Sequence, residues 1–248
     1  MEWAFIEPML PMKVRGVQRR DDRQVLSGVF FVLRVGCPWS DMPERYGPHM
    51  TAYNRFVCRT RAGVRDRIMD AVVDAHNGDV VMIDGTSVRV HHAAATLKKR
   101  DPRRCMGRSR GGLTTKIHVL VNEVGLPLKI HLTLGQAHGG PAADVLLRGL
   151  QPGQAVLADK AYDANWIRAL IWEQGAEAVI PSKADRTLSI PVDRDLHRQR
   201  NTVERFIGRI KRTFRRIATR YDKTSDAFLA FITLAAIRIW CDAYEPAA

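Results

Sequence analysis

Two short apolar runs in this sequence each end directly in an aspartate. Val80 to Ile83 precedes Asp84, and Ala155 to Ala158 precedes Asp159. An ionised carboxylate at the end of a buried strand is costly unless it is paired or binds a metal ion. The fold therefore has to place both acids where a cation can compensate their charge.

The order of the elements predicted between residues 79 and 248 narrows the fold class. Strands come first, with a hairpin signal at 122–125, and helices then alternate with strands. This order predicts an α/β protein with a ribonuclease-H-like fold, a mixed five-stranded sheet with helices on both faces. The predicted strands cover 80–90, 114–121, 128–134, 155–158 and 178–180, and the predicted helices cover 140–150, 165–174, 196–219 and 225–243.

The first and fourth strands of such a sheet are adjacent and parallel, which places Asp84 and Asp159 side by side. Two bare carboxylates there would repel each other, and one would hold a proton. A divalent cation removes this conflict, and hard oxygen ligands favour Mg²⁺ or Mn²⁺.

A third acid is expected on the helix predicted over 196–219. Its apolar residues, Val203 and Phe206 among them, share one face at about 100° per residue. Glu204 is the only acid in this arginine-rich stretch and lies at the edge of that face. It can therefore lean into a site beside the sheet. The alternative is an ion pair with Arg200, one turn earlier.

The N-terminal part of the chain is predicted to be helical. Asp21 and Asp22 can cap one helix, a second is expected over 51–61, and a third begins near Val64. Their surface arginines suit a helix-turn-helix-like DNA-binding module, and a subdomain that only packs on the rest is an equal alternative. We predict a helical DNA-binding domain over 1–78 and a catalytic domain over 79–248, and we expect DNA contacts from Arg55 and Arg59.

The charge balance points to a polyanionic partner. The chain has 39 Lys and Arg against 26 Asp and Glu, a net charge of +13. A basic insertion at 91–113 has little apolar content, so we expect an arm that orders on DNA, and a solvated hairpin extension is the alternative. The DNA contacts expected from this insertion are Lys98, Lys99, Arg100, Arg103, Arg104, Arg108 and Arg110.

Membrane and disulfide-rich classes are not expected. The apolar stretch from Val29 to Leu33 is far too short to span a bilayer, and residues 1–13 do not resemble a signal peptide. The four cysteines are scattered and show no zinc-binding spacing, which indicates reduced thiols. We therefore expect an intracellular protein with no membrane partner.

The motifs around these acids resemble those of the DDE transposases of bacterial insertion sequences, specifically the insertion-sequence-five family. The third-acid signature of that family is Tyr, two residues, Arg, three residues, Glu, six residues, Lys. Here His197 takes the place of the Tyr, and the other three positions match. The matching strings are Ile83-Asp84-Gly85-Thr86, Ala158-Asp159-Lys160-Ala161-Tyr162-Asp163, residues 36–45, residues 107–116, and the spacing of Arg200, Glu204 and Lys211.

This resemblance implies a Mg²⁺-dependent DNA transposase of the bacterial cytoplasm, acting at the nucleoid. Two Mg²⁺ ions, for which Mn²⁺ can substitute, would be held by Asp84, Asp159 and Glu204. The enzyme would bind terminal inverted repeats, cleave the DNA at the element ends and join the 3′ hydroxyl ends to target DNA, as a homodimer or a larger assembly. Further DNA contacts are expected from Arg200, Lys211, His197 and Arg215.

Three residues near these motifs have open roles. His138 and Lys160 are candidates for supporting the metal ligands or contacting the substrate, or they belong only to loops. Asp163 is expected to cap the helix that follows it rather than to act as a fourth ligand.

Two other functions are compatible with the same fold. One is a nuclease or resolvase that cuts DNA without joining strands. The other is a DNA-binding protein that has lost catalysis, which the presence of all three acids disfavours.

Overall fold

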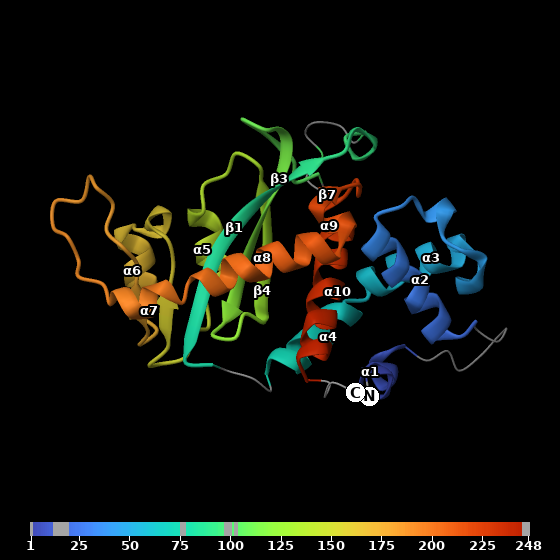
Figure 1. Cartoon of the computed structure of the whole chain (residues 1–248), viewed down its shortest axis with the longest axis horizontal. Coiled ribbons are helices and arrows are strands. Elements are labelled where there is room, and N and C mark those ends of the chain that lie inside the picture. Colours follow the sequence, from blue (N-terminus) through green and yellow to red (C-terminus); the bar gives the residue numbers. More distant parts are fainter. Residues whose placement is uncertain (1, 12–19, 75–77, 97–100, 102–103, 245–248) are drawn as a thin grey trace. The chain divides into compact units, whose positions relative to one another are not determined.

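The structure is a computed structural model and describes residues 2–11, 20–74, 78–96, 101 and 104–244 (Figure 1). The chain forms two compact units. Unit 1 consists of Met1–Ala75, His91–Arg104 and Ile210–Ala248, and unit 2 consists of His76–Val90 and Cys105–Arg209.

Unit 2 is built on a mixed sheet. Its strands are β1 (Val80–Val90), β2 (Gly107–Ser109), β3 (Gly112–Asn122), β4 (Pro127–Leu134), β5 (Ala155–Leu157) and β6 (Glu177–Val179). Strand β3 pairs antiparallel with β1, β4 and β2, whereas β5 pairs parallel with β1 and β6. The mixed sheet is confirmed, but it has seven strands and not the predicted five. The five predicted strands lie in the order β4-β3-β1-β5-β6, and β2 adds a short strand that pairs with the start of β3.

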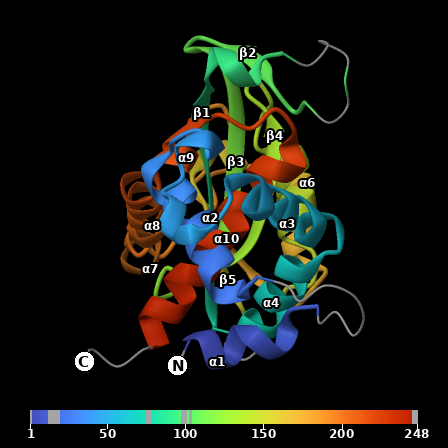
Figure 2. The ribbon, with the colours of Figure 1, turned by 90° about the vertical axis from the view of Figure 1, so that its right-hand side faces the viewer.

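Alternation along the strands assigns the two faces of this sheet. Val81 and Ile83 belong to a buried apolar cluster with residues of α5 (Gly140–Leu146) and α6 (Asn165–Trp172). Successive side chains point to opposite faces, so Met82 and Asp84 lie on the other face. That face carries α7 (Arg194–Arg198) and α8 (Asn201–Thr213), and Figure 2 shows α8 and α6 on opposite sides of the sheet.

The helix predicted over 196–219 is divided in the structure. The chain forms α7, α8 and a short α9 (Arg215–Ala218), with an extended residue, Phe214, between the last two (φ −120°, ψ 94°). After this bend Arg216 pairs with Asp222 at 2.9 Å and donates to the carbonyl of Cys37, contacts that a straight helix would redirect. Helical periodicity survives such a break, so the pattern alone could not reveal it.

Unit 1 is mainly helical. Its elements are α1 (Glu2–Ile6), α2 (Asp22–Val35), α3 (His49–Arg61), α4 (Val64–Val73), α9, β7 (Thr219–Arg220) and α10 (Ser225–Tyr244), with short 3₁₀ turns at Glu7–Met9, Trp39–Asp41, Glu44–Tyr46 and His92–Ala94. The predicted cap is confirmed, because the Asp21 carboxylate accepts from the Arg23 N–H at 2.9 Å. Helices α3 and α4 meet at Gly63, whose left-handed φ of 62° makes the tight turn between them.

Helix α10 packs against the N-terminal helices α3 and α4 and against α9. Phe231 stacks on Phe56 with ring centroids 4.4 Å apart, and Trp39 lies 5.9 Å from Phe231. The predicted domains, 1–78 and 79–248, are two continuous stretches of sequence. The compact units are made of several segments, because 91–104 and 210–248 belong to the same unit as the N-terminal helices.

By length and composition α10 could cross a membrane, and it is a longer apolar segment than the one considered in the sequence. In its apolar stretch of 18 residues, 61% is buried inside the protein. Residues such as Phe228, Phe231 and Trp240 are fully enclosed. This burial is that of a core helix.

Candidate active site

The sheet register brings the first two acids together. Val80 pairs with Ala155 and Met82 with Leu157 in the parallel ladder of β1 and β5. Asp84 and Asp159 each come two residues after this last pair, so their side chains point to the same face of the sheet. The predicted juxtaposition of the two aspartates follows from this register.

Asp84 lies in a partly buried, electrostatically crowded position. Its side chain is 20% exposed, and its Oδ1 accepts from the Gly85 N–H at 2.7 Å. Burial, together with the carboxylates of Asp159 and Glu204, raises the pKa of Asp84, against the opposing effects of the Gly85 N–H and Arg200. The three predicted acids thus form one electrostatic cluster.

Asp159 is fixed by the turn that follows it. Its carboxylate accepts from the Ala161 N–H at 2.9 Å and caps the 3₁₀ turn Lys160–Tyr162. Tyr162 is 4% exposed, and burial, followed by Asp84 and Asp159, raises the pKa of its phenol. Tyr162 was not among the residues predicted for the site, although its place three residues after Asp159 in a tight turn is a signal for it.

Glu204 lies in the first turn of α8 and is paired with Arg200. Its Oε1 accepts from Arg200 Nη2 at 2.5 Å, and Arg200 Nη1 lies 3.6 Å from Asp84 Oδ2. The ion pair considered as an alternative for Glu204 is therefore present, and the same guanidinium also reaches the first aspartate. Glu204 is 49% exposed at its side chain and is open to solvent.

His197 connects α7 to the strand that carries the second acid. Its Nε2 lies 3.2 Å from the carbonyl oxygen of Ala158, directly before Asp159. A protonated Nε2 donates to this carbonyl, and the bond holds the approach to α8 beside the end of β5.

The donor set fits Mg²⁺ or Mn²⁺. All three ligands are carboxylates, the hard oxygen donors that these ions prefer, and their repulsion is what a cation would relieve. No group of three or more His, Cys, Asp or Glu in the described residues is already arranged closely enough to hold an ion. The Arg200 guanidinium instead provides positive charge to Asp84 and Glu204.

The arginines predicted on the N-terminal helices are engaged within unit 1. Arg55 forms an ion pair with Asp22, and Arg59 Nη2 lies 2.9 Å from the same carboxylate. Their side chains are only 14% and 11% exposed. The observed role of both is to join α3 to α2, and their contact with DNA stays a prediction.

The other residues predicted to contact DNA differ in their exposure to solvent. Arg108 and Arg110 are exposed in and after β2, Arg104 is half-buried, and Arg215 is exposed on α9. Lys211 is half-buried on α8, where burial lowers the pKa of its ammonium group. Lys98, Lys99, Arg100 and Arg103 lie outside the described residues.

His138 is exposed in the loop after β4, and Lys160 is exposed in the 3₁₀ turn directly after Asp159. His138 precedes Gly139, where an added Cβ would lie 3.1 Å from the Tyr162 ring. The loop carrying His138 thus packs on the residue beside Asp84 and Asp159. Whether either side chain acts in the site stays a prediction.

Asp163 has a different structural role from the predicted one. The N-cap of α6 is Ala164, so the prediction that Asp163 caps this helix is wrong. Its carboxylate instead accepts from Arg168 Nε at 2.8 Å, from Arg186 Nε at 2.9 Å and from the Lys183 N–H at 2.8 Å. The buried carboxylate therefore holds the segment between β6 and α7 next to the start of α6.

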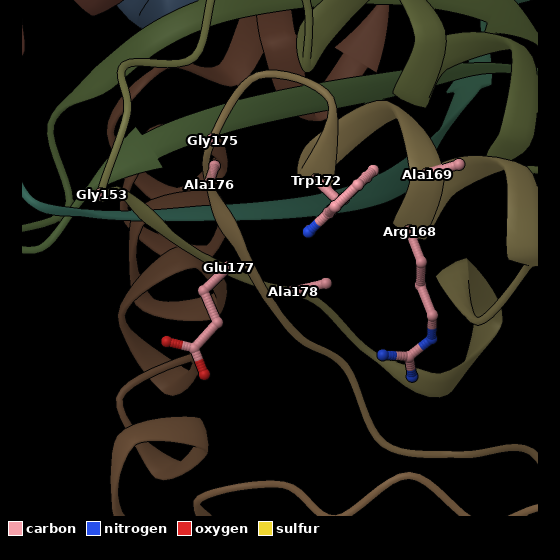
Figure 3. A pocket seen from close by; sticks show the side chains of 8 residues that line it. All are labelled: Gly153, Arg168, Ala169, Trp172, Gly175, Ala176, Glu177 and Ala178. Atoms are coloured by element: carbon pink, nitrogen blue, oxygen red, sulfur yellow. The ribbon is translucent and has the colours of Figure 1, made fainter.

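A cavity of about 680 Å³ lies apart from these acids. It is lined by residues of α6 and β6 and their neighbours, including Arg168, Trp172 and Glu177 (Figure 3). None of the three acids lines it, so this cavity is not part of the candidate site.

The family follows from comparison with known proteins. Residues 1–69 match the family described as "Putative transposase of IS4/5 family", and residues 75–240 match the family described as "Transposase DDE domain". The chain belongs to the DDE transposases of the IS4/5 family. The resemblance seen in the motifs is thereby confirmed, and this transposase is an enzyme of the polynucleotidyl transferase type.

Individual relatives agree with this assignment. A "Putative transposase for insertion sequence element IS6501" of Brucella ovis is 41% identical over 129 residues, covering 52% of this chain and 98% of that protein. The "Transposase for insertion sequence element IS1106" of Neisseria meningitidis serogroup B is 24% identical over 216 residues, covering 85% of this chain and 69% of that protein.

The fold also resembles a solved transposase. The cryo-EM structure of the piggyBac transposase synaptic complex with hairpin DNA has a TM-score of 0.52 at 9% identity, covering 96% of this chain and 69% of that chain. This likeness supports the ribonuclease-H-like fold of the transposase.

Proposed function

We propose that this transposase binds the terminal inverted repeats of its insertion sequence, cleaves the DNA at the element ends and joins the freed 3′ hydroxyl ends to target DNA. The observation that carries the proposal is the clustering of Asp84, Asp159 and Glu204, from three distant parts of the chain, on one face of the sheet. Acids held together against their mutual repulsion are typical of a catalytic site.

Asp84, Asp159 and Glu204 would hold two divalent ions. The chemistry that bound Mg²⁺ supplies to such a site is activation of the attacking oxygen and stabilisation of the leaving one. Water is the attacking group in cleavage, and the 3′ hydroxyl is the attacking group in joining. The protein fixes the positions of its carboxylates through the Gly85 and Ala161 N–H groups.

The surface next to Glu204 suits the phosphate backbone of DNA. Arg205 and Arg209 are exposed on α8, and an added Cβ at Gly208 would meet no atom within 4 Å. A phosphodiester backbone can therefore approach this helix closely and meet positive charge beside the acids. A dimer or a larger assembly in the bacterial cytoplasm would pair the two element ends.

The test uses duplex oligonucleotides that carry the element end and a second set with a pre-cut 3′ hydroxyl. The wild-type protein with Mg²⁺ or Mn²⁺ is expected to nick the first set and to join the second set to a target plasmid. Asp84→Asn, Asp159→Asn and Glu204→Gln are each expected to reduce both reactions by at least about 10³-fold, and Arg198→Gln serves as a control. Cleavage without joining would instead identify a nuclease.

A further inference from the structure

Arg200 occupies a position between two of the three acids. Its Nη2 donates to Glu204 Oε1 at 2.5 Å, and its Nη1 lies 3.6 Å from Asp84 Oδ2. The side chain is 21% exposed, so water screens these interactions less than at an open surface. One guanidinium thereby links the strand acid to the helix acid.

The carboxylates need this positive charge when no metal ion is bound. Asp84 lies within the electrostatic influence of both Asp159 and Glu204, and Arg200 acts in the opposite direction. A planar guanidinium with several N–H donors can pair with two carboxylates at once, which a single ammonium group does less well.

We propose that Arg200 is an internal counter-cation, which holds Asp84 and Glu204 together in the metal-free protein and competes with the metal ions for them. Carboxylate oxygens engaged by Arg200 are the oxygens that an ion would bind, so metal binding displaces the guanidinium. This inference rests on the proposed function, since it assumes that the three acids bind metal.

The location of Arg200 in the chain allows such a displacement. It follows the end of α7 at Arg198 and precedes α8, which begins at Asn201. Its side chain is therefore attached at a junction between helices. Once released from the acids, the guanidinium is available to a DNA phosphate next to Glu204.

The experiment compares full-length wild-type protein with Arg200→Gln, Arg200→Lys and the matched control Arg198→Gln. Arg198 pairs with Asp195 at 2.8 Å, and these side chains are 80% and 87% exposed, so its removal tests a nearby arginine outside the acid cluster. Mn²⁺ binding is measured by electron paramagnetic resonance of the free ion, and thermal unfolding is recorded in EDTA.

Arg200→Gln is expected to bind Mn²⁺ roughly 2- to 5-fold more tightly than wild type, on the scale of a partly exposed ion pair. In EDTA its Tm is expected to fall by about 2–4 °C, because the acids lose their counter-charge. Arg200→Lys is expected to show smaller changes in the same directions. If Arg200 only repelled the metal ion as a nearby positive charge, Arg200→Gln would keep the wild-type Tm in EDTA. Arg200→Lys, which keeps the charge, would then bind Mn²⁺ with wild-type affinity.

Asp84→Asn separates failure of this inference from failure of the proposed function. If Asp84→Asn loses Mn²⁺ binding while Arg200→Gln binds like Arg198→Gln, the metal site stands and the counter-cation role is overturned. If wild type and Asp84→Asn bind Mn²⁺ equally, or neither binds it, both proposals are overturned. Should Arg200→Gln fail to fold by circular dichroism, an Arg200→Lys variant with wild-type Mn²⁺ affinity and wild-type Tm in EDTA overturns the inference.

Discussion

Single buried polar groups set the local rigidity around this site. Asp163 is 1% exposed at its side chain and compensates two arginines from different segments, Arg168 of α6 and Arg186 of the segment after β6. The ion pair between Asp163 and Arg186 thereby joins the two ends of the segment 163–186. Removing one member leaves the others buried without their partner, which costs more than the pair contributes.

Asp163→Asn is expected to destabilise the transposase by about 2–4 kcal/mol, because Arg168 and Arg186 lose their carboxylate. Burial disfavours the charged form of Asp163, but the hydrogen bonds from Arg186, the Lys183 N–H and Arg168 outweigh it and hold the pKa well below its usual value. The stabilisation is therefore complete above about pH 4 and is lost as the pH falls towards the folded-state pKa. Urea denaturation at pH 7 and pH 3 should show a smaller difference between variant and wild type at pH 3, and an equal difference would contradict this role.

His118 is expected to make stability depend on pH in a different range. It is fully buried on β3, its Nε2 lies 2.8 Å from Thr133 Oγ1, and burial, with Lys116 and His131, lowers its pKa to about 4. The unfolded chain takes up a proton near pH 6.5 while the folded chain stays neutral, so stability falls between about pH 6.5 and pH 4. His118→Gln should flatten the urea-denaturation free energy in this interval. A slope as steep as that of wild type would assign the dependence to other groups.

At the scale of whole helices, α10 makes the clearest contribution to the core of unit 1. Its side chains Phe228, Phe231 and Trp240 are fully buried, and Arg216 lies 4.8 Å above the ring of Phe231. The helix therefore organises the core of unit 1 through the stack of Phe231 on Phe56 and the neighbouring Trp39.

Phe231→Ala is expected to destabilise the protein by about 3–5 kcal/mol, since it leaves a cavity among aromatic rings. Tyr244→Ala, at the 53% exposed end of the same helix, is the control and should change the free energy of unfolding far less. Denaturation followed by tryptophan fluorescence measures both. A Phe231→Ala variant as stable as Tyr244→Ala would show that α10 is not part of this core.

The whole molecule carries a net charge of +13, which no single element explains. Phosphate contacts release counterions from DNA, so the affinity of a protein making about 6–10 such contacts falls about 10³- to 10⁵-fold between about 50 and 200 mM salt. We expect this dependence for the transposase on duplex DNA of any sequence. Fluorescence anisotropy across a salt series measures it, and a nearly flat plot of log affinity against log salt would contradict a binding mode dominated by phosphates.

The sequence alone was sufficient to predict five of the seven strands, the parallel pairing that brings Asp84 and Asp159 together, and the transposase family. Strand periodicity and motif spacing are properties of neighbouring residues, and the parallel pairing of the first and fourth strands then follows from the fold. The ion pair between Arg200 and Glu204 was also visible in their separation of four residues along the chain.

Only the tertiary structure decided which distant side chains share a partner. Arg200 also reaches Asp84, Asp163 joins Arg168 and Arg186, and α10 packs with the N-terminal helices. Periodicity shows that a residue is buried but not what covers it, and a helical pattern continues unchanged through the break at Phe214. The partners of a buried charge depend on how segments far apart in the chain approach each other, which local patterns do not encode.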